Sequence, residues 1–177
     1  MKKSIIIIAA IFMMGFSSNL MAQITENTIA SGEIISQLTI TETSPLYFGK
    51  MAVLNLTGGT CVLSTAAVRT PTLGVNLSAS TPTNAEYDVT GENNATYAIT
   101  VDPTITVTKP VTLETMTINS MKLKTTANAT ERNAAGATST LSGTGTDHIV
   151  VGGTLNVAAG QVKGVYSGTF DVTVAYN

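Results

Sequence analysis

The sequence predicts an all-β protein, an antiparallel β-sandwich, on three observations. Charged residues make up only 11% of the chain, against about 25% in a typical domain, and threonine and serine fill the solvent-facing positions instead. Threonine is β-branched and packs well on a pleated sheet, whereas it loses side-chain freedom in a helix. After Gln23, no window shows apolar residues at helical spacing. Short alternating segments recur instead between turn residues, a spacing typical of a sandwich rather than of βαβ units.

The first 22 residues have the three regions of a secretory signal peptide. Two lysines precede an apolar run from Ile5 to Phe16, and residues 20–22 form a small-residue cleavage site. The apolar run is shorter than the roughly 20 residues that a membrane-spanning helix needs. We therefore expect a cleavable signal-peptide helix over residues 1–22, one sandwich domain over residues 23–177, and no transmembrane segment after cleavage.

Alternation of apolar and polar residues predicts twelve strands. In the clearest pair, Tyr87 and Val89 alternate with polar residues, as do Tyr97, Ile99 and Val101. A loop rich in glycine and asparagine joins the two strands into a hairpin. In chain order, the predicted strands span residues 33–41, 47–56, 60–64, 74–79, 85–90, 96–101, 105–108, 115–124, 138–142, 147–151, 154–158 and 165–176.

Three local features refine this prediction. The apolar residues of the strand 115–124 change parity at Asn119-Ser120, so a β-bulge there is needed to keep one buried face. Gly58-Gly59 and Gly152-Gly153 each precede a predicted strand, and we interpret both as tight turns that need positive φ. The segment 125–136 has no apolar period and is expected to form a long surface loop, with room for one helical turn.

Composition excludes several function classes. Without the signal peptide, seven basic and eleven acidic residues remain, a net charge of −4, which argues against nucleic acid as a partner. Cys61 is the only cysteine, and we expect a buried thiol rather than an intermolecular bridge. His148 is the only histidine, so a catalytic triad or a zinc site lacks residues. Glu86 and Asp88 share one strand face, which we interpret as solvated. We expect no enzymatic activity, no metal and no cofactor.

The last segment has the cleanest alternation in the chain. One parity carries its aromatic and branched apolar residues, whereas the opposite parity carries mostly polar ones. A terminal strand with this contrast is expected to bury one face. Its apolar positions are Tyr166, Phe170, Val172, Val174 and Tyr176.

These closing residues resemble the C-termini of chaperone–usher fimbrial subunits, which have a penultimate tyrosine and a glycine fourteen places from the end. Here those positions hold Tyr176 and Gly164. More widely, Gly58-Gly59-Thr60, residues 87–91, residues 151–157 and the closing segment are similar to an exported bacterial family of unknown function (domain of unknown function 4402 type). That family is related in pattern to spore coat protein U and to fimbrial subunits.

The resemblance implies an immunoglobulin-like β-sandwich whose open edge accepts a strand from a neighbour. It makes Gly164, Tyr166, Phe170, Val172, Val174 and Tyr176 candidate assembly residues. The partners would be other copies, related subunits or a periplasmic chaperone, in the periplasm, on the cell surface or outside the cell. Two alternatives stay open: a complete sandwich whose last strand pairs only within its own sheet, and a monomeric secreted module that binds carbohydrate or a host surface.

Overall fold

The structure is a computed structural model that describes residues 23–177. The predicted signal peptide, residues 1–22, lies outside the described residues. Residues 23–34 form no strand, and their side chains are exposed. The compact unit spans Ile35–Asn177. Within residues 23–177, no helix is long and apolar enough to cross a membrane.

All the strands of the compact unit pair antiparallel, and no helix interrupts them in the described part of the chain. The predicted all-β, immunoglobulin-like antiparallel sandwich is therefore confirmed as the fold class. In chain order the strands are β1 (Thr39–Ser44), β2 (Met51–Val53), β3 (Gly59–Leu63), β4 (Arg69–Pro71), β5 (Val75–Leu77), β6 (Ala85–Thr90), β7 (Thr96–Val101), β8 (Ile105–Thr108), β9 (Thr115–Thr125), β10 (Arg132–Asn133), β11 (Ala137–Thr140), β12 (Thr146–Val157) and β13 (Val172–Tyr176).

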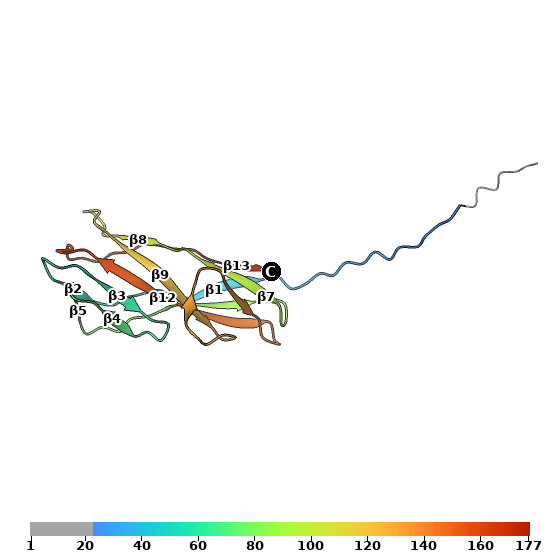
Figure 1. Cartoon of the computed structure of the whole chain (residues 1–177), viewed down its shortest axis with the longest axis horizontal. Coiled ribbons are helices and arrows are strands. Elements are labelled where there is room, and N and C mark those ends of the chain that lie inside the picture. The colour runs from blue at the N-terminus through green and yellow to red at the C-terminus, as the bar shows by residue number, and fades with distance from the viewer. Residues whose placement is uncertain (1–22) are drawn as a thin grey trace, which may run out of the picture. The chain divides into compact units, whose positions relative to one another are not determined.

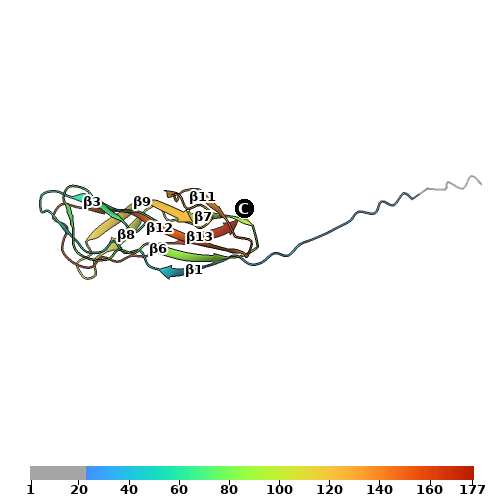
Figure 2. The same ribbon diagram turned by 90° about the horizontal axis from the view of Figure 1, so that it is seen from below.

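The larger sheet is organised around β12, its longest strand (Figure 1). One edge of β12 pairs with β9, which in turn pairs with β8 and β10. The other edge pairs first with β6 and then, beyond Gly152, with β3. Strand β1 lies outside β6, as Figure 2 shows, and β4 lies outside β3. The second sheet has the order β11-β7-β13, and β2 pairs with β5 in a small third sheet.

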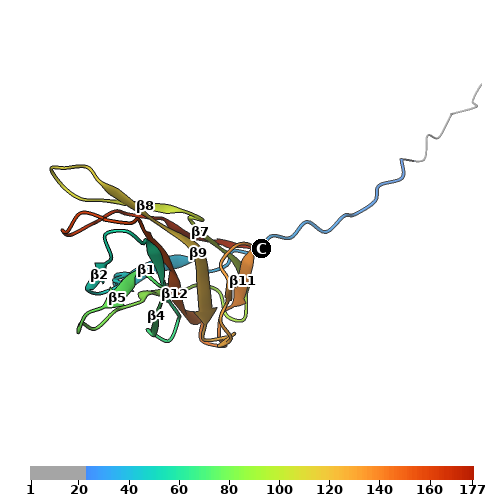
Figure 3. The same cartoon turned by 60° about the vertical axis from the view of Figure 1, so that its left-hand side comes forward.

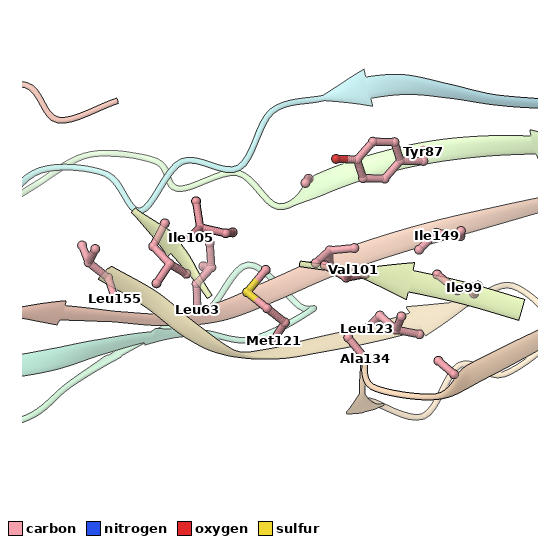
Figure 4. Packing of buried hydrophobic residues seen from close by; sticks show 14 of the residues in the cluster. Leu63, Tyr87, Ile99, Val101, Ile105, Met121, Leu123, Ala134, Ile149 and Leu155 are labelled. Carbon is pink, nitrogen blue, oxygen red and sulfur yellow. The ribbon is translucent and has the colours of Figure 1, made fainter. Parts of the chain in front are cut away.

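The core lies between the sheets and is mostly aliphatic. Tyr97, Leu63, Leu123 and Ile149 are among its largest fully buried side chains, and Figure 4 shows side chains from β3, β7, β9 and β12 meeting in one layer. Each such side chain contributes about 1.5–3 kcal/mol by leaving water. The Cys61 thiol is free and fully buried, which confirms the expected burial.

The predicted β-bulge in β9 is confirmed. Gly152 pairs with Lys122 and Thr154 pairs with Asn119, so two residues of β9 lie opposite Gly153 alone. One of the two is Ser120, whose φ is +51°. The extra residue lets Ile118 and Met121, three positions apart, point into the same core.

The predicted turn at Gly152-Gly153 is wrong, because both glycines lie inside β12 and neither has a positive φ. They serve close approach instead. A Cβ on Gly152 would lie 2.2 Å from the Leu63 carbonyl oxygen of β3, and one on Gly153 would lie 2.8 Å from the Met121 sulfur. The predicted turn at Gly58-Gly59 is wrong for the same reason, since the two residues have no positive φ and crowd neighbouring backbone.

Candidate functional site

The predicted C-terminal strand forms at the edge of the smaller sheet, but it is shorter than expected. β13 covers Val172–Tyr176 and pairs only with β7, with Val174 opposite Ile99 and Tyr176 opposite Tyr97. The apolar residues of β13 are half-buried and pack against the core, whereas its intervening residues are exposed. The apolar side chains of β13 therefore point toward the core and the intervening ones toward solvent, as the alternation predicts. The apolar face of β13 is, however, only partly covered by the core.

One edge of β13 has no partner strand among the described residues. The Asn177 amide donates to the Thr96 carbonyl at 3.3 Å, and the Asp102 amide donates to the Asp171 carbonyl at 3.2 Å. Odd-numbered residues of the C-terminal segment therefore direct their backbone groups toward β7. In an antiparallel pair, the backbone amides and carbonyls of successive residues point alternately toward the partner strand and away from it. The amides and carbonyls of Val172, Val174 and Tyr176 consequently point away from β7.

The two sheets end side by side at this edge. β1 is the outermost strand of the larger sheet, with β6 as its only partner strand in the described residues. It lies next to β13, the outermost strand of the smaller sheet. Leu38, just before β1, and Ile40 of β1 are partly buried against the same core as Val172 and Val174. The sandwich is thus bordered on this side by two edge strands.

Tyr176 fixes the end of this edge. Its hydroxyl donates to the Ser36 carbonyl at 2.9 Å and accepts from the Glu92 amide at 2.6 Å. The Glu92 carboxylate accepts from the Ser36 amide at 2.8 Å, and this bond is the first cause of the lowered pKa of Glu92. A Cβ on Gly91 would lie 2.3 Å from the Tyr176 hydroxyl, so the loop needs glycine there. The penultimate tyrosine therefore joins three segments of its own chain.

The remaining predicted site residues precede β13. Tyr166 donates from its hydroxyl to the Val162 carbonyl at 2.7 Å and accepts from the Gln161 side chain at 2.8 Å, which folds the loop after β12. Phe170 is half-buried against the core. Gly164 is exposed and lies against the Lys109 side chain.

The predicted strand over residues 165–171 is wrong, because this part of the segment makes one bridge, Ser167 to Thr108, and no continuous ladder. Gly168 lies so close to β8 that a Cβ there would be 2.4 Å from the Thr106 carbonyl oxygen. The segment therefore follows the edge of β8 without pairing along it.

A second polar group lies on the outer face of the larger sheet. His148 of β12 is opposite Asp88 of β6, with 2.7 Å between Nδ1 and Oδ1, and its Nε2 lies 3.6 Å from the Glu86 carboxylate. All three side chains are at least one third exposed, in keeping with a solvated face. Residues 23–177 contain no group of three side chains that could hold a metal ion.

Asp147 precedes His148 in β12, so its side chain points to the opposite, inner face of the sheet and is buried. Its carboxylate accepts from the Tyr97 hydroxyl at 2.9 Å, from the Ser139 hydroxyl at 2.5 Å and from the Thr126 amide at 2.9 Å. Burial first, and then the Asp147 carboxylate, raise the pKa of Tyr97. Because the carboxylate is fully hydrogen-bonded, it holds the loop after β9 in place and is not directed at a ligand.

Comparison with known proteins gives a family but no activity. A family model described as a domain of unknown function (DUF4402) matches residues 38–176, nearly the whole compact unit. No curated protein matches the chain.

Proposed function

The chain belongs to the DUF4402 family, and we propose that it is an exported structural subunit that assembles through the free edge of β13. A strand from another copy or from a related subunit adds to this edge and extends the smaller sheet. The assembly would be a fibre, coat or layer outside the cytoplasm. The likeness of the closing residues to fimbrial subunits and spore coat protein U agrees with this proposal.

The single observation that carries the proposal is the unpaired backbone of β13. Natural proteins commonly protect an edge strand with lysine, proline, a bulge or a covering loop. β13 has the sequence Val-Thr-Val-Ala-Tyr, without a charge, a proline or a bulge. β1, the neighbouring edge, carries Glu42 and an irregular register. The edge of β13 is thus the one better suited to accept a strand.

The free edge of β13 offers an added strand both hydrogen-bonding groups and apolar surface. The outward amides and carbonyls of Val172, Val174 and Tyr176 offer up to six hydrogen bonds, each worth about 1 kcal/mol net. An added strand would also cover the half-exposed side chains of Val172 and Val174, which contributes about 25 cal/mol per Å² of apolar area removed from water. Strand addition gains affinity from the main chain in this way and specificity from the side chains that flank it.

The proposal is tested with Val174→Pro and its control Val174→Ala. The Val174 amide points away from β7, so proline removes a donor from the free edge and leaves the β7–β13 hydrogen bonds in place. Alanine removes a similar part of the side chain and keeps the donor. Chain 23–177 is compared by sedimentation velocity, and material sheared from the producing cells is run on SDS gels with and without boiling.

Strand addition is supported if the parent and Val174→Ala assemble and give a ladder that collapses on boiling, whereas Val174→Pro gives no ladder and associates more weakly. Equal assembly in all three chains would show that the β13 edge is not the contact. A single monomer band and monomeric sedimentation for the parent would contradict the structural role and favour a monomeric binding module.

A further inference from the structure

The end of the sandwich away from the C-terminus is apolar. Four loops meet there, residues 54–58, 72–74, 109–114 and 158–165, and we call them together the apolar tip. Figures 1 and 3 both show the β8–β9 loop and the loop after β12 at this end, opposite the C-terminus. Its exposed aliphatic side chains are Leu54, Leu56, Leu73, Val111, Leu113, Val162 and Val165.

Most of these side chains are largely exposed. Leu56 and Val111 are each 94% exposed, Leu73 is 84% exposed and Val165 is 80% exposed. Isolated apolar residues on a surface need no explanation, whereas a contiguous group marks an interaction site. The apolar tip gathers seven exposed aliphatic side chains on four loops that touch one another.

Hydrogen bonds and close contacts join the four loops. The Leu54 amide donates to the Gly74 carbonyl at 2.9 Å, and the Gly160 amide donates to the Leu54 carbonyl at 3.2 Å. The Gln161 side chain donates to the Thr115 carbonyl at 3.2 Å at the base of the β8–β9 loop. A hollow of about 490 Å³, lined by Gly58, Gly59, Met116, Val157 and others, lies beside the first and the last of these loops.

The β8–β9 loop presents its apolar side chains at a conformational cost. Val111 has a φ of +78° and Leu113 a φ of +62°, a region that a β-branched residue such as valine rarely adopts. Residues held in such a conformation are strained and cluster at functional positions. Glycine or asparagine would form this loop more cheaply, so its aliphatic side chains call for an explanation in binding.

The chain itself contains an apolar segment that could cover the tip. Residues 23–34 carry Ile24, Ile29 and Ile34, all at least 90% exposed. The charges are complementary, since the segment has Glu26 and Glu33 and no basic residue. In the tip, the Glu114 carboxylate lies 3.9 Å from the Lys109 ammonium group. Lys163 is then the charged residue of the tip that has no ion pair among the described residues.

The segment cannot reach the tip of its own molecule with Ile29. Ser36 is anchored by Tyr176 at the opposite end of the compact unit. The twelve residues of β12 connect the two ends, a distance of about 36 Å at ~3.3 Å per residue. Ile29 lies seven positions before Ser36, a stretch that spans at most about 25 Å when fully extended. One molecule therefore cannot place both Ile24 and Ile29 on its own tip, whereas a second copy can.

We propose that the apolar tip binds residues 23–34 of a second copy of this chain, with Ile24 and Ile29 as the apolar anchors. The contact is head-to-tail, so each copy uses both halves and association continues along a line. This contact would be a second one within the assembly proposed above. It rests on the proposed function only because both require that copies of the chain associate. It involves different residues, so the two proposals can fail separately.

The experiment uses chain 23–177 with Val174→Pro, which blocks the β13 edge. One variant adds Ile24→Ser and Ile29→Ser in the segment, a second adds Leu56→Ser and Val111→Ser in the tip, and a control adds Val68→Ser, an exposed valine in the turn after β3. All changes are at exposed positions, where substitutions alter stability little. Sedimentation equilibrium measures the association constant of each chain and of the equimolar mixture of the first two.

The segment variant and the tip variant should each associate at least tenfold more weakly than the control. The equimolar mixture of the two variants should form dimers but nothing larger. In each dimer the intact segment of the tip variant binds the intact tip of the segment variant, and no further intact pair remains. Association of the segment variant at the control's strength would overturn the proposal and point to tip-to-tip contact or another occupant. A control chain that stays monomeric would overturn it as well, while leaving the β13 edge intact as a proposal.

Discussion

Replacing Gly152 by alanine is expected to cost far more stability than replacing its neighbour Gly153. Both glycines lie in β12, and alanine removes about the same unfolded-state entropy at each, so the difference between them reports packing alone. A Cβ on Gly152 lies 2.2 Å from the Leu63 carbonyl oxygen, a backbone atom of β3, whereas a Cβ on Gly153 lies 2.8 Å from the end of the flexible Met121 side chain.

The size of the effect follows from these contacts. To restore a separation of 3.0 Å, β3 and β12 must move apart by about 0.8 Å at Gly152. The buried Asn84 amide bridges the same two strands, donating to the Ser64 carbonyl at 2.9 Å and to the Val151 carbonyl at 3.1 Å. A shift of this size breaks at least one of these bonds, and a buried unsatisfied group costs about 1–3 kcal/mol. With the strain of overpacking, we expect about 2–4 kcal/mol for Gly152→Ala and about 1 kcal/mol or less for Gly153→Ala.

Urea unfolding followed by circular dichroism measures both costs, with the unchanged slope as a check on two-state behaviour. A loss of 2–4 kcal/mol is a large part of the 5–15 kcal/mol typical of a domain. Equal stability of the two variants, or a greater loss in Gly153→Ala, would refute the assignment of Gly152 to close backbone packing.

Three further outcomes are expected. Tyr176→Phe removes the hydroxyl that joins Ser36 and Glu92 and should lower the free energy of unfolding by about 1–3 kcal/mol; an unchanged urea midpoint would contradict this role. Arg69→Lys should cost about 1–3 kcal/mol, because the guanidinium donates to four carbonyls around β2 and β5, and a lysine cannot reproduce this fork; hydrogen exchange in residues 48–50 and 78–80 should rise. Burial, and then Glu42, raise the pKa of Tyr87 to about 12. The neutral phenol is favoured in the folded chain, so this contribution to stability is complete below pH 10 and is lost as the pH rises toward about 12. The difference in tyrosinate absorbance between the parent and Tyr87→Phe should rise only as the pH approaches about 12. A rise of this difference near pH 10 would contradict the raised pKa of Tyr87.

Sequence reasoning succeeded where the signal is local. β6, β7 and β8 have the predicted bounds, because alternation and turn residues occur within a few positions of each other. The bulge in β9 was also predictable, since a parity change at Asn119-Ser120 has few other solutions in a one-sided strand. The turns predicted at Gly58-Gly59 and Gly152-Gly153 were wrong, because a tight turn and a close approach of two strands both select glycine.

The candidate site depends on features that have no local signal. The alternation of β13 was visible in the sequence, but its position at a sheet edge is a property of topology. The partners of Tyr176, Ser36 and Glu92, lie 140 and 84 positions away along the chain. The apolar tip likewise gathers residues from four loops, each of which contributes only one or two aliphatic side chains.

The most direct test of the central proposal, that β13 accepts a strand, is amide hydrogen exchange in monomeric and assembled protein. The amides of Thr173 and Ala175 face β7 and should be protected in both states, which provides an internal control. The amides of Val172, Val174 and Tyr176 should exchange quickly in the monomer and become protected on assembly. Fast exchange of these three amides in the assembled protein would contradict strand addition at β13.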